Sequence, residues 1–171
     1  MTIREIITVP HETLRLKSRK VTSFGADLQT LIDDMVETMR AAPGVGLAAP
    51  QVNVSQRVIV IEFAEGEEDE EITPELHICV NPKITQSSAE QEVGTEGCLS
   101  IPGIVGDVSR PDAITVKYLN RHGQPMKLKA SGWLARIFQH EVDHLNGVLF
   151  VDLAEKVWPI EGETTQISAA D

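Results

Sequence analysis

The stretch His140-Glu141-Val142-Asp143-His144 decides how this chain is organised. It lies within residues 131–147, where apolar residues recur at close to helical spacing, namely Trp133, Leu134, Ile137, Phe138, Val142 and Leu145. Ser131 and Gly147 are suitable residues to cap the two ends of such a helix. The pattern therefore predicts a helix over residues 131–147.

The two histidines of this stretch are predicted to share a metal ion. Residues four apart lie on one face of a helix, so the imidazoles of His140 and His144 point the same way. Glu141 is rotated by about 100° from His140, which places it beside the metal as a proton carrier and not as a ligand. The segment is apolar on more than one side, and buried ionisable groups must be paired or metal-bound. The spacing alone indicates no more than a metal-dependent hydrolase, because many unrelated folds contain the same motif.

The composition indicates a single globular domain, which we take as residues 1–171. Apolar residues make up 42% of the chain, which is ordinary for a globular protein. The net charge is −11, and residues 65–71 contribute six of the negative charges. We expect this acidic run to be a solvated loop. The acidic balance argues against a specific nucleic-acid ligand.

The cysteine count and the hydropathy indicate the compartment. Cys79 and Cys98 are too few for a disulfide framework and fit a reducing environment. No stretch approaches the length needed to span a membrane, and the N-terminus shows no signal or transit peptide pattern. We therefore expect a cytoplasmic protein with no membrane partner.

Further elements follow from periodicity. Residues 27–40 carry one apolar stripe and predict an amphipathic helix. Alternating or β-branched apolar runs predict four strands, at residues 58–61, 77–80, 113–119 and 126–130. We expect the strand at 77–80 to end at Asn81-Pro82 and residues 83–92 to continue the sheet. Residues 1–26 look irregular, and we expect a loosely ordered tail over residues 153–171.

A catalytic metal needs a third protein ligand besides the two histidines. Cys98 lies in Glu96-Gly-Cys-Leu-Ser100, and a thiolate near a divalent cation is a strong ligand. A free cysteine is equally often a buried apolar residue. The residues alone leave Cys98, Cys79, His77 and an acidic side chain as candidates.

Three stretches, in this order, resemble the signature motifs of the peptide deformylases: Gly44-Val-Gly-Leu-Ala-Ala-Pro-Gln51, Glu96-Gly-Cys-Leu-Ser100 and Gln139-His-Glu-Val-Asp-His144. On its own the first stretch would favour an ordinary tight turn, and its glycines allow close approach of the backbone. The resemblance covers roughly residues 5–153. It implies an α+β fold in which antiparallel sheets wrap around a central metal-binding helix, with one further N-terminal amphipathic helix. It also implies removal of the formyl group from N-terminal formyl-methionine.

The resemblance assigns roles position by position. The metal ligands are Cys98, His140 and His144. Glu141 matches the catalytic acid/base, while Gln51 and the backbone N–H of Leu99 match the groups that hold the formyl oxygen. Glu96 and Arg110 match a structural pair that braces the cysteine loop.

Substrate contacts are assigned in the same way. Gly46 and Val45 lie where the family's backbone pairs with the substrate peptide. An apolar pocket for the methionine side chain is predicted at Val45, Trp133, Ile137 and the ring of His140, although core packing explains Ile137 and Trp133 equally well.

The resemblance favours Fe²⁺ as the metal, and one thiolate with two imidazoles is also compatible with Zn²⁺, Ni²⁺ or Co²⁺. The implied partners are formyl-Met N-termini of nascent peptides and the ribosome exit region, and we expect a monomer. Two other functions compete. A zinc endopeptidase usually takes its third ligand downstream, where this chain offers only acidic candidates. A non-catalytic metal-binding protein would need neither Glu141 nor Gln51.

Overall fold

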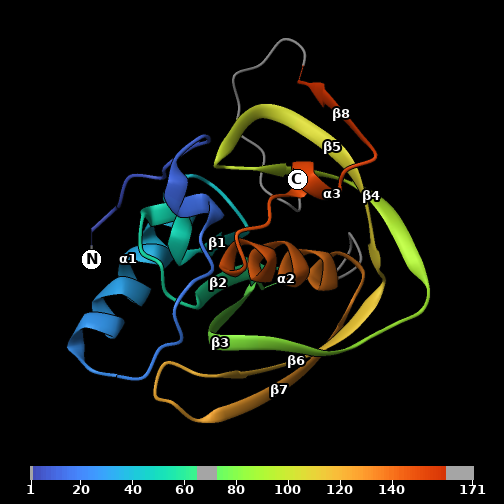
Figure 1. Ribbon diagram of the computed structural model, residues 1–171. Coiled ribbons are helices and arrows are strands. Elements are labelled where there is room, and N and C mark those ends of the chain that lie inside the picture. The colour runs from blue at the N-terminus through green and yellow to red at the C-terminus, as the bar shows by residue number, and fades with distance from the viewer. Residues whose placement is uncertain (1, 65–72, 161–171) are drawn as a thin grey trace.

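The structure is a computed structural model that describes residues 2–64 and 73–160 (Figure 1). Two antiparallel sheets lie on either side of a helix, α2, which contacts strands of both sheets. This arrangement confirms the expected α+β class. The acidic run at 65–71, which we expected to be a solvated loop, lies outside the described residues.

The larger sheet has five strands in the order β1-β2-β3-β6-β7, and each neighbouring pair is antiparallel. Its strands are β1 (Gly46–Ala48), β2 (Val58–Phe63), β3 (Glu75–Ser87), β6 (Ala113–Leu119) and β7 (Pro125–Ser131). The smaller sheet, ordered β4-β5-β8, consists of β4 (Gln91–Cys98), β5 (Ile101–Pro111) and β8 (Lys156–Pro159). β1 and β4 are therefore edge strands.

Strand β2 of the larger sheet is covered on both faces. Side chains alternate between the two faces of a strand. Along β2, Val58 and Val60 pack with α1 (Ala26–Ala41) in one core cluster, while Ile59 and Ile61 pack with α2 (Gly132–Leu145) in another. Burial on both sides explains why this segment is a continuous apolar run without alternation.

Helix α1 confirms the helix predicted at residues 27–40. Its apolar stripe lies on the sheet, and Ile32, Met35 and Met39 are fully buried there. Full burial of each such side chain contributes about 1.5–3 kcal/mol of hydrophobic stabilisation. The remaining helical segments are short: η1 (Glu12–Arg15), η2 (Ala49–Val52) and α3 (Phe150–Leu153).

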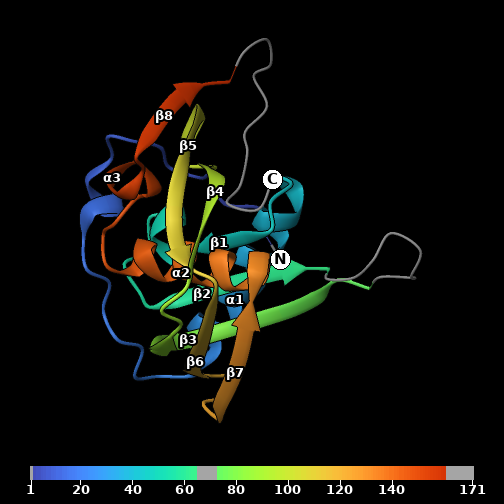
Figure 2. The same ribbon diagram turned by 90° about the vertical axis from the view of Figure 1, so that its right-hand side faces the viewer.

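Helix α2 confirms the second predicted helix and is buried on nearly all sides (Figure 2). Ser131 occupies the N-cap position but its side chain makes no capping hydrogen bond. The helix ends at Asn146, and Gly147 follows in the left-handed region with φ +73°, which favours glycine. Among the described residues, no helix has the length and apolar character that a membrane crossing would require.

The predicted end of a strand at Asn81-Pro82 is wrong, because β3 runs on through both residues. Asn81 adopts a φ of +51°, and the register with β6 shifts between Val80 and Lys83. The Asn81 side chain accepts a hydrogen bond from Val21 N–H and donates one to Val21 C=O. These contacts hold an irregular residue inside the strand. Only residues 83–87 continue this sheet, and 91–98 form β4 of the other sheet.

The expectation of a loosely ordered tail from residue 153 is wrong for its first part. Residues 156–159 form β8, which pairs antiparallel with residues 104–107 of β5. Most side chains of β8 are exposed, so backbone hydrogen bonds to the edge of β5 order this segment. The order of apolar and polar residues in the sequence cannot predict such a strand, because its side chains have no buried face. Residues 161–171 lie outside the described ranges.

Replacing Met35 by alanine is expected to lower the free energy of unfolding by about 2–5 kcal/mol. Met35 is fully buried between α1 and the sheet, so the substitution leaves a cavity. Urea denaturation measures this loss. Thr30→Ala, on the exposed side of the same helix, should change stability by about 0.5 kcal/mol or less. A loss below about 1 kcal/mol for Met35→Ala would contradict this packing.

Candidate metal centre

Three side chains converge between β4 and α2. The sulfur of Cys98, at the end of β4, lies close to the ring nitrogens of His140 and His144, and the three ligand atoms are all within 4.8 Å of one another. The Cys98 Sγ to His144 Nε2 distance is 3.4 Å. All three residues are buried. Within the described part of the chain, this group includes neither Cys79 nor His77, so the structure selects Cys98 among the candidates.

The spacing of these atoms fits a metal ion. In a tetrahedral site with metal–sulfur and metal–nitrogen bonds of about 2.3 and 2.0 Å, the sulfur and a ring nitrogen lie about 3.5 Å apart. His140 makes an Nδ1 hydrogen bond to Glu96 Oε1 at 2.9 Å, which directs its Nε2 toward the cluster. A carboxylate on the far nitrogen is the usual means of orienting a metal-binding histidine. The site therefore suits a divalent cation held by one thiolate and two imidazoles.

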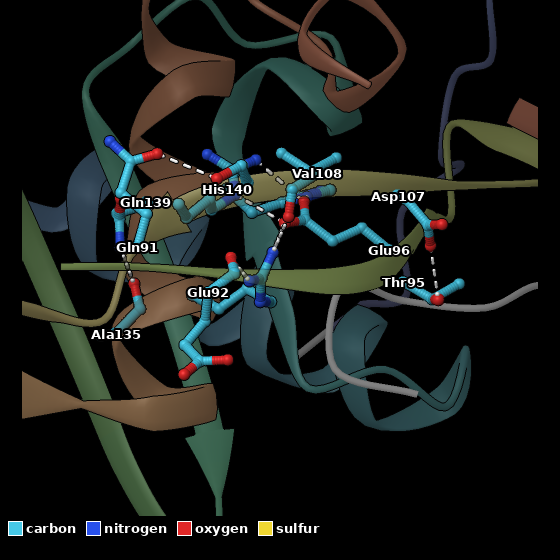
Figure 3. A network of polar contacts seen from close by, with 12 residues as sticks. Gln91, Glu92, Thr95, Glu96, Asp107, Val108, Ala135, Gln139 and His140 are labelled. Carbon is cyan, nitrogen blue, oxygen red and sulfur yellow. Dashed lines mark hydrogen bonds and ion pairs between the residues drawn. The ribbon is translucent and has the colours of Figure 1, made fainter. Parts of the chain in front are cut away.

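Glu96 is fully buried and is held from three directions (Figure 3). Arg110 donates to both carboxylate oxygens, at 2.5 and 2.8 Å, and Arg136 donates to Oε2 at 2.6 Å. Burial alone would raise the pKa of Glu96, but the hydrogen bonds from Arg110 and His140 outweigh it and lower that pKa to about 2. Glu96 is therefore ionised and fixed.

The brace predicted from Glu96 and Arg110 is larger than expected. Arg110 also donates to Asp143 Oδ2 at 2.8 Å, so two carboxylates are balanced by two guanidinium groups. Asp143 and Arg136 were not predicted to take part. Arg136 lies one turn before His140, and a single cation among the apolar residues of 133–138 was the available signal.

Glu141 lies beside the cluster with its carboxylate largely without partners. It is 2% exposed, and its Oε1 makes no hydrogen bond to the described residues. Burial raises its pKa to about 7, which suits a group that exchanges protons near neutral pH. A Cβ atom at Gly46 would lie 2.5 Å from Glu141 Oε2, so the glycine leaves the space that this carboxylate occupies.

The Gln51 amide is oriented toward the cysteine. Its Oε1 accepts a hydrogen bond from Ala48 N–H at 3.0 Å. Its Nε2 therefore faces the other way and donates to Ser100 Oγ at 3.1 Å, with Cys98 Sγ at 3.6 Å. Leu99 follows Cys98 in the adjoining turn and is buried. The structure thus brings Gln51 and Leu99 to the metal cluster.

The predicted methionine-pocket residues lie in different environments. Ile137 is fully buried in the core cluster shared with β2, and Val45 is half-buried against the same cluster. Trp133 is 42% exposed and lines a recess of about 230 Å³ together with Arg136. On α2, the lining residues Trp133 and Arg136 lie about two turns and one turn before His140.

The chain resembles known proteins over most of its length. A family model described as polypeptide deformylase matches residues 3–158. The peptide deformylase of Symbiobacterium thermophilum is 46% identical over 171 residues, which cover all of this chain and 76% of that protein. That of Rhizobium meliloti is 47% identical over 158 residues, covering 92% of this chain and 88% of that protein.

The fold of the chain is also similar to solved structures of peptide deformylases. A peptide deformylase from Ehrlichia chaffeensis in complex with actinonin superposes with a TM-score of 0.84 at 43% identity, covering 91% of each chain. One from Legionella pneumophila superposes with a TM-score of 0.81 at 45% identity, covering 90% of this chain and 87% of the other.

Replacing Cys98 by serine is expected to abolish binding of Co²⁺, because a hydroxyl is a far weaker ligand than a thiolate. The absorption band of the cobalt–thiolate bond is the measurement. Cys79→Ser is the matched control, since Cys79 is buried in β3 outside the cluster. Disappearance of the band in the Cys79 variant, with retention in the Cys98 variant, would refute this ligand assignment.

Proposed function

The chain belongs to the peptide deformylase family, and from that premise we propose how its own residues remove the formyl group from N-terminal formyl-methionine of newly synthesised polypeptides. The observation that carries this proposal is the cluster of Cys98, His140 and His144 with the buried carboxylate of Glu141 beside it. Neither a structural metal site nor a packing role needs such a carboxylate.

Glu141 is the proton carrier of the proposed mechanism. Cys98, His140 and His144 would hold a divalent cation, which would supply Lewis acidity and lower the pKa of a water molecule at the site. Glu141 Oε1, which has no partner among the described residues, accepts a proton from the attacking water as the oxygen of that water adds to the formyl carbon. The same carboxyl then delivers a proton to the departing amine, leaving formate and a free N-terminus. Burial raises the pKa of this carboxyl above its ordinary value, which brings its uptake and release of a proton toward neutral pH.

Gln51 and Leu99 stabilise the negative charge that develops on the formyl oxygen. The Gln51 Nε2 group is aimed at the cluster because its oxygen is already held by Ala48 N–H. The backbone N–H of Leu99 belongs to the residue that directly follows the ligand Cys98. Losing one donor of this kind typically raises the barrier by about 3–4 kcal/mol.

The substrate backbone is proposed to pair with the edge strands that flank the cluster. β1, which begins at Gly46, is an edge of the larger sheet, and β4, which ends at Cys98, is an edge of the smaller one. An extended peptide adds to an exposed edge through main-chain hydrogen bonds. Val45 and Gly46 are the proposed contacts on the β1 side.

The methionine side chain is proposed to enter the recess at Trp133. An exposed indole at the mouth of a recess of about 230 Å³ suits a flexible thioether. Contacts from Val45 and Ile137 stay predictions, since both pack in the adjoining core cluster.

We propose Fe²⁺ as the native metal, in line with the donor set of one thiolate and two imidazoles. Metal analysis of protein purified without oxygen tests this proposal, and finding Zn²⁺ as the bound metal of the active enzyme would contradict it. We propose a monomer, because the three possible metal ligands all come from one chain and the site needs no residue of a second copy. Cytoplasmic location and docking near the ribosome exit stay predictions.

A zinc endopeptidase remains the alternative reading of the two histidines and the glutamate. The location of the third ligand, upstream on β4, argues against it. Incubation with formyl-Met-Ala-Ser and with casein separates the two functions. We expect formate from the peptide and intact casein, and cleavage of casein without formate release would overturn the proposal.

Glu141→Gln is expected to leave metal binding intact and to lower the rate of formate release by about 10²–10⁴-fold, because an amide cannot accept the proton. Metal content and formate are measured on the same preparation. Glu62→Gln is the control, since Glu62 is paired with Arg40 away from the cluster. Loss of metal in the Glu141 variant would instead identify Glu141 as a ligand.

Gln51→Leu is expected to lower the rate of formate release by about 10²–10³-fold, because leucine keeps the volume but offers no donor. Steady-state kinetics with the formyl peptide measures the effect, and the Michaelis constant should change much less than the turnover number. A higher Michaelis constant with an unchanged turnover number would show that Gln51 contributes to substrate binding alone.

A further inference from the structure

Arg136 is a buried cation that the mechanism above does not use. It is 6% exposed and lies on α2 one turn before the ligand His140. Its Nη1 donates to Glu96 Oε2 at 2.6 Å and to Val108 C=O at 2.9 Å, and its Nη2 donates to Glu92 C=O at 2.8 Å. One side chain of α2 therefore binds both β4 and β5.

The guanidinium group is also confined on its other sides. Its Cζ lies 5.4 Å from the centroid of the Trp133 ring, a cation–π contact. A Cβ atom at Gly94 would lie 2.7 Å from that Cζ, so the glycine provides the slot that the guanidinium fills. Three hydrogen bonds and the cation–π contact with Trp133 thus hold Arg136 in the space that Gly94 leaves free.

This position matters because the metal ligands come from two elements. Cys98 ends β4, whereas His140 and His144 belong to α2. Arg136 spans the gap between these elements and holds Glu96, whose other oxygen bonds His140 Nδ1. Without Arg136, Arg110 is the one guanidinium group among the described residues that still pairs with Glu96, and Arg110 is shared with Asp143.

We propose that Arg136 is a positioning residue for the metal centre, which fixes the carboxylate of Glu96 and, through Glu96, the orientation of the His140 imidazole. The proposal concerns metal binding, so it is tested without the deformylation assay and its failure is distinct from failure of the proposed function.

The test is the affinity of the full-length chain for Zn²⁺, measured by competition with a chelator. Arg136→Met is expected to weaken binding by about 10–100-fold, the usual effect of losing a group that supports a metal ligand. Arg136→Lys should recover most of this loss, because an ammonium can still donate to Glu96. Arg40→Met is the matched control, since Arg40 pairs with Glu62 outside the site, and it should leave the affinity unchanged.

A double-mutant cycle distinguishes positioning from general stability. If Arg136 acts through Glu96, adding Arg136→Met to Glu96→Gln should weaken Zn²⁺ binding little further. If the double variant loses Zn²⁺ affinity by the product of the two single-variant effects, the proposal is overturned. So would an Arg136→Met protein that unfolds at lower temperature but, where folded, binds Zn²⁺ within about twofold of the parent, because that result would describe a structural residue.

Gly94→Ala provides a second variant if Arg136→Met fails to fold. The added methyl group would displace the guanidinium while leaving every charge in place. We expect weaker Zn²⁺ binding, and unchanged affinity in a folded Gly94→Ala protein would overturn the proposal.

Discussion

The buried carboxylate of Glu96 is the constraint on which the rest of the structure depends. A charge without access to water is tolerated only when it is paired and hydrogen-bonded on all sides. Glu96 meets this condition through Arg110, Arg136 and His140, which come from β5 and from α2. Satisfying one anion therefore requires the smaller sheet and the central helix to meet at a fixed distance. The ligand Cys98 is two residues away from that anion along β4, so its sulfur is carried to the histidines by the same arrangement.

Elements with strong periodicity could be predicted from the sequence, and those held by backbone pairing could not. Helices α1 and α2 each bury a continuous apolar face, which leaves a clear pattern. The run at Val58–Ile61 was also recognisable, because both of its faces are covered. β8 carries mostly exposed side chains, and β3 continues through an asparagine with positive φ. Both depend on main-chain hydrogen bonds to partners far along the chain, and no local pattern records those partners.

The residues of the site also fall into those that the sequence could predict and those that it could not. His140 and His144 could be paired from sequence, because helical geometry converts a separation of four into one face. Residue types alone could not choose Cys98, since its distance to the histidines depends on how β4 packs against α2. Family resemblance supplied that choice, and the structure supports it. Arg136 was missed because its partners include two backbone carbonyls on other strands, which no side-chain motif encodes.

The two edge strands beside the metal cluster have a consequence for the range of substrates. Under the proposed pairing, a peptide along β1 and β4 would be bound mainly through its main chain, whose groups are the same at every position except proline. Recognition of this kind is indifferent to most side chains beyond the first residue. One enzyme of this design can therefore process a whole proteome, with discrimination concentrated at the terminal side chain.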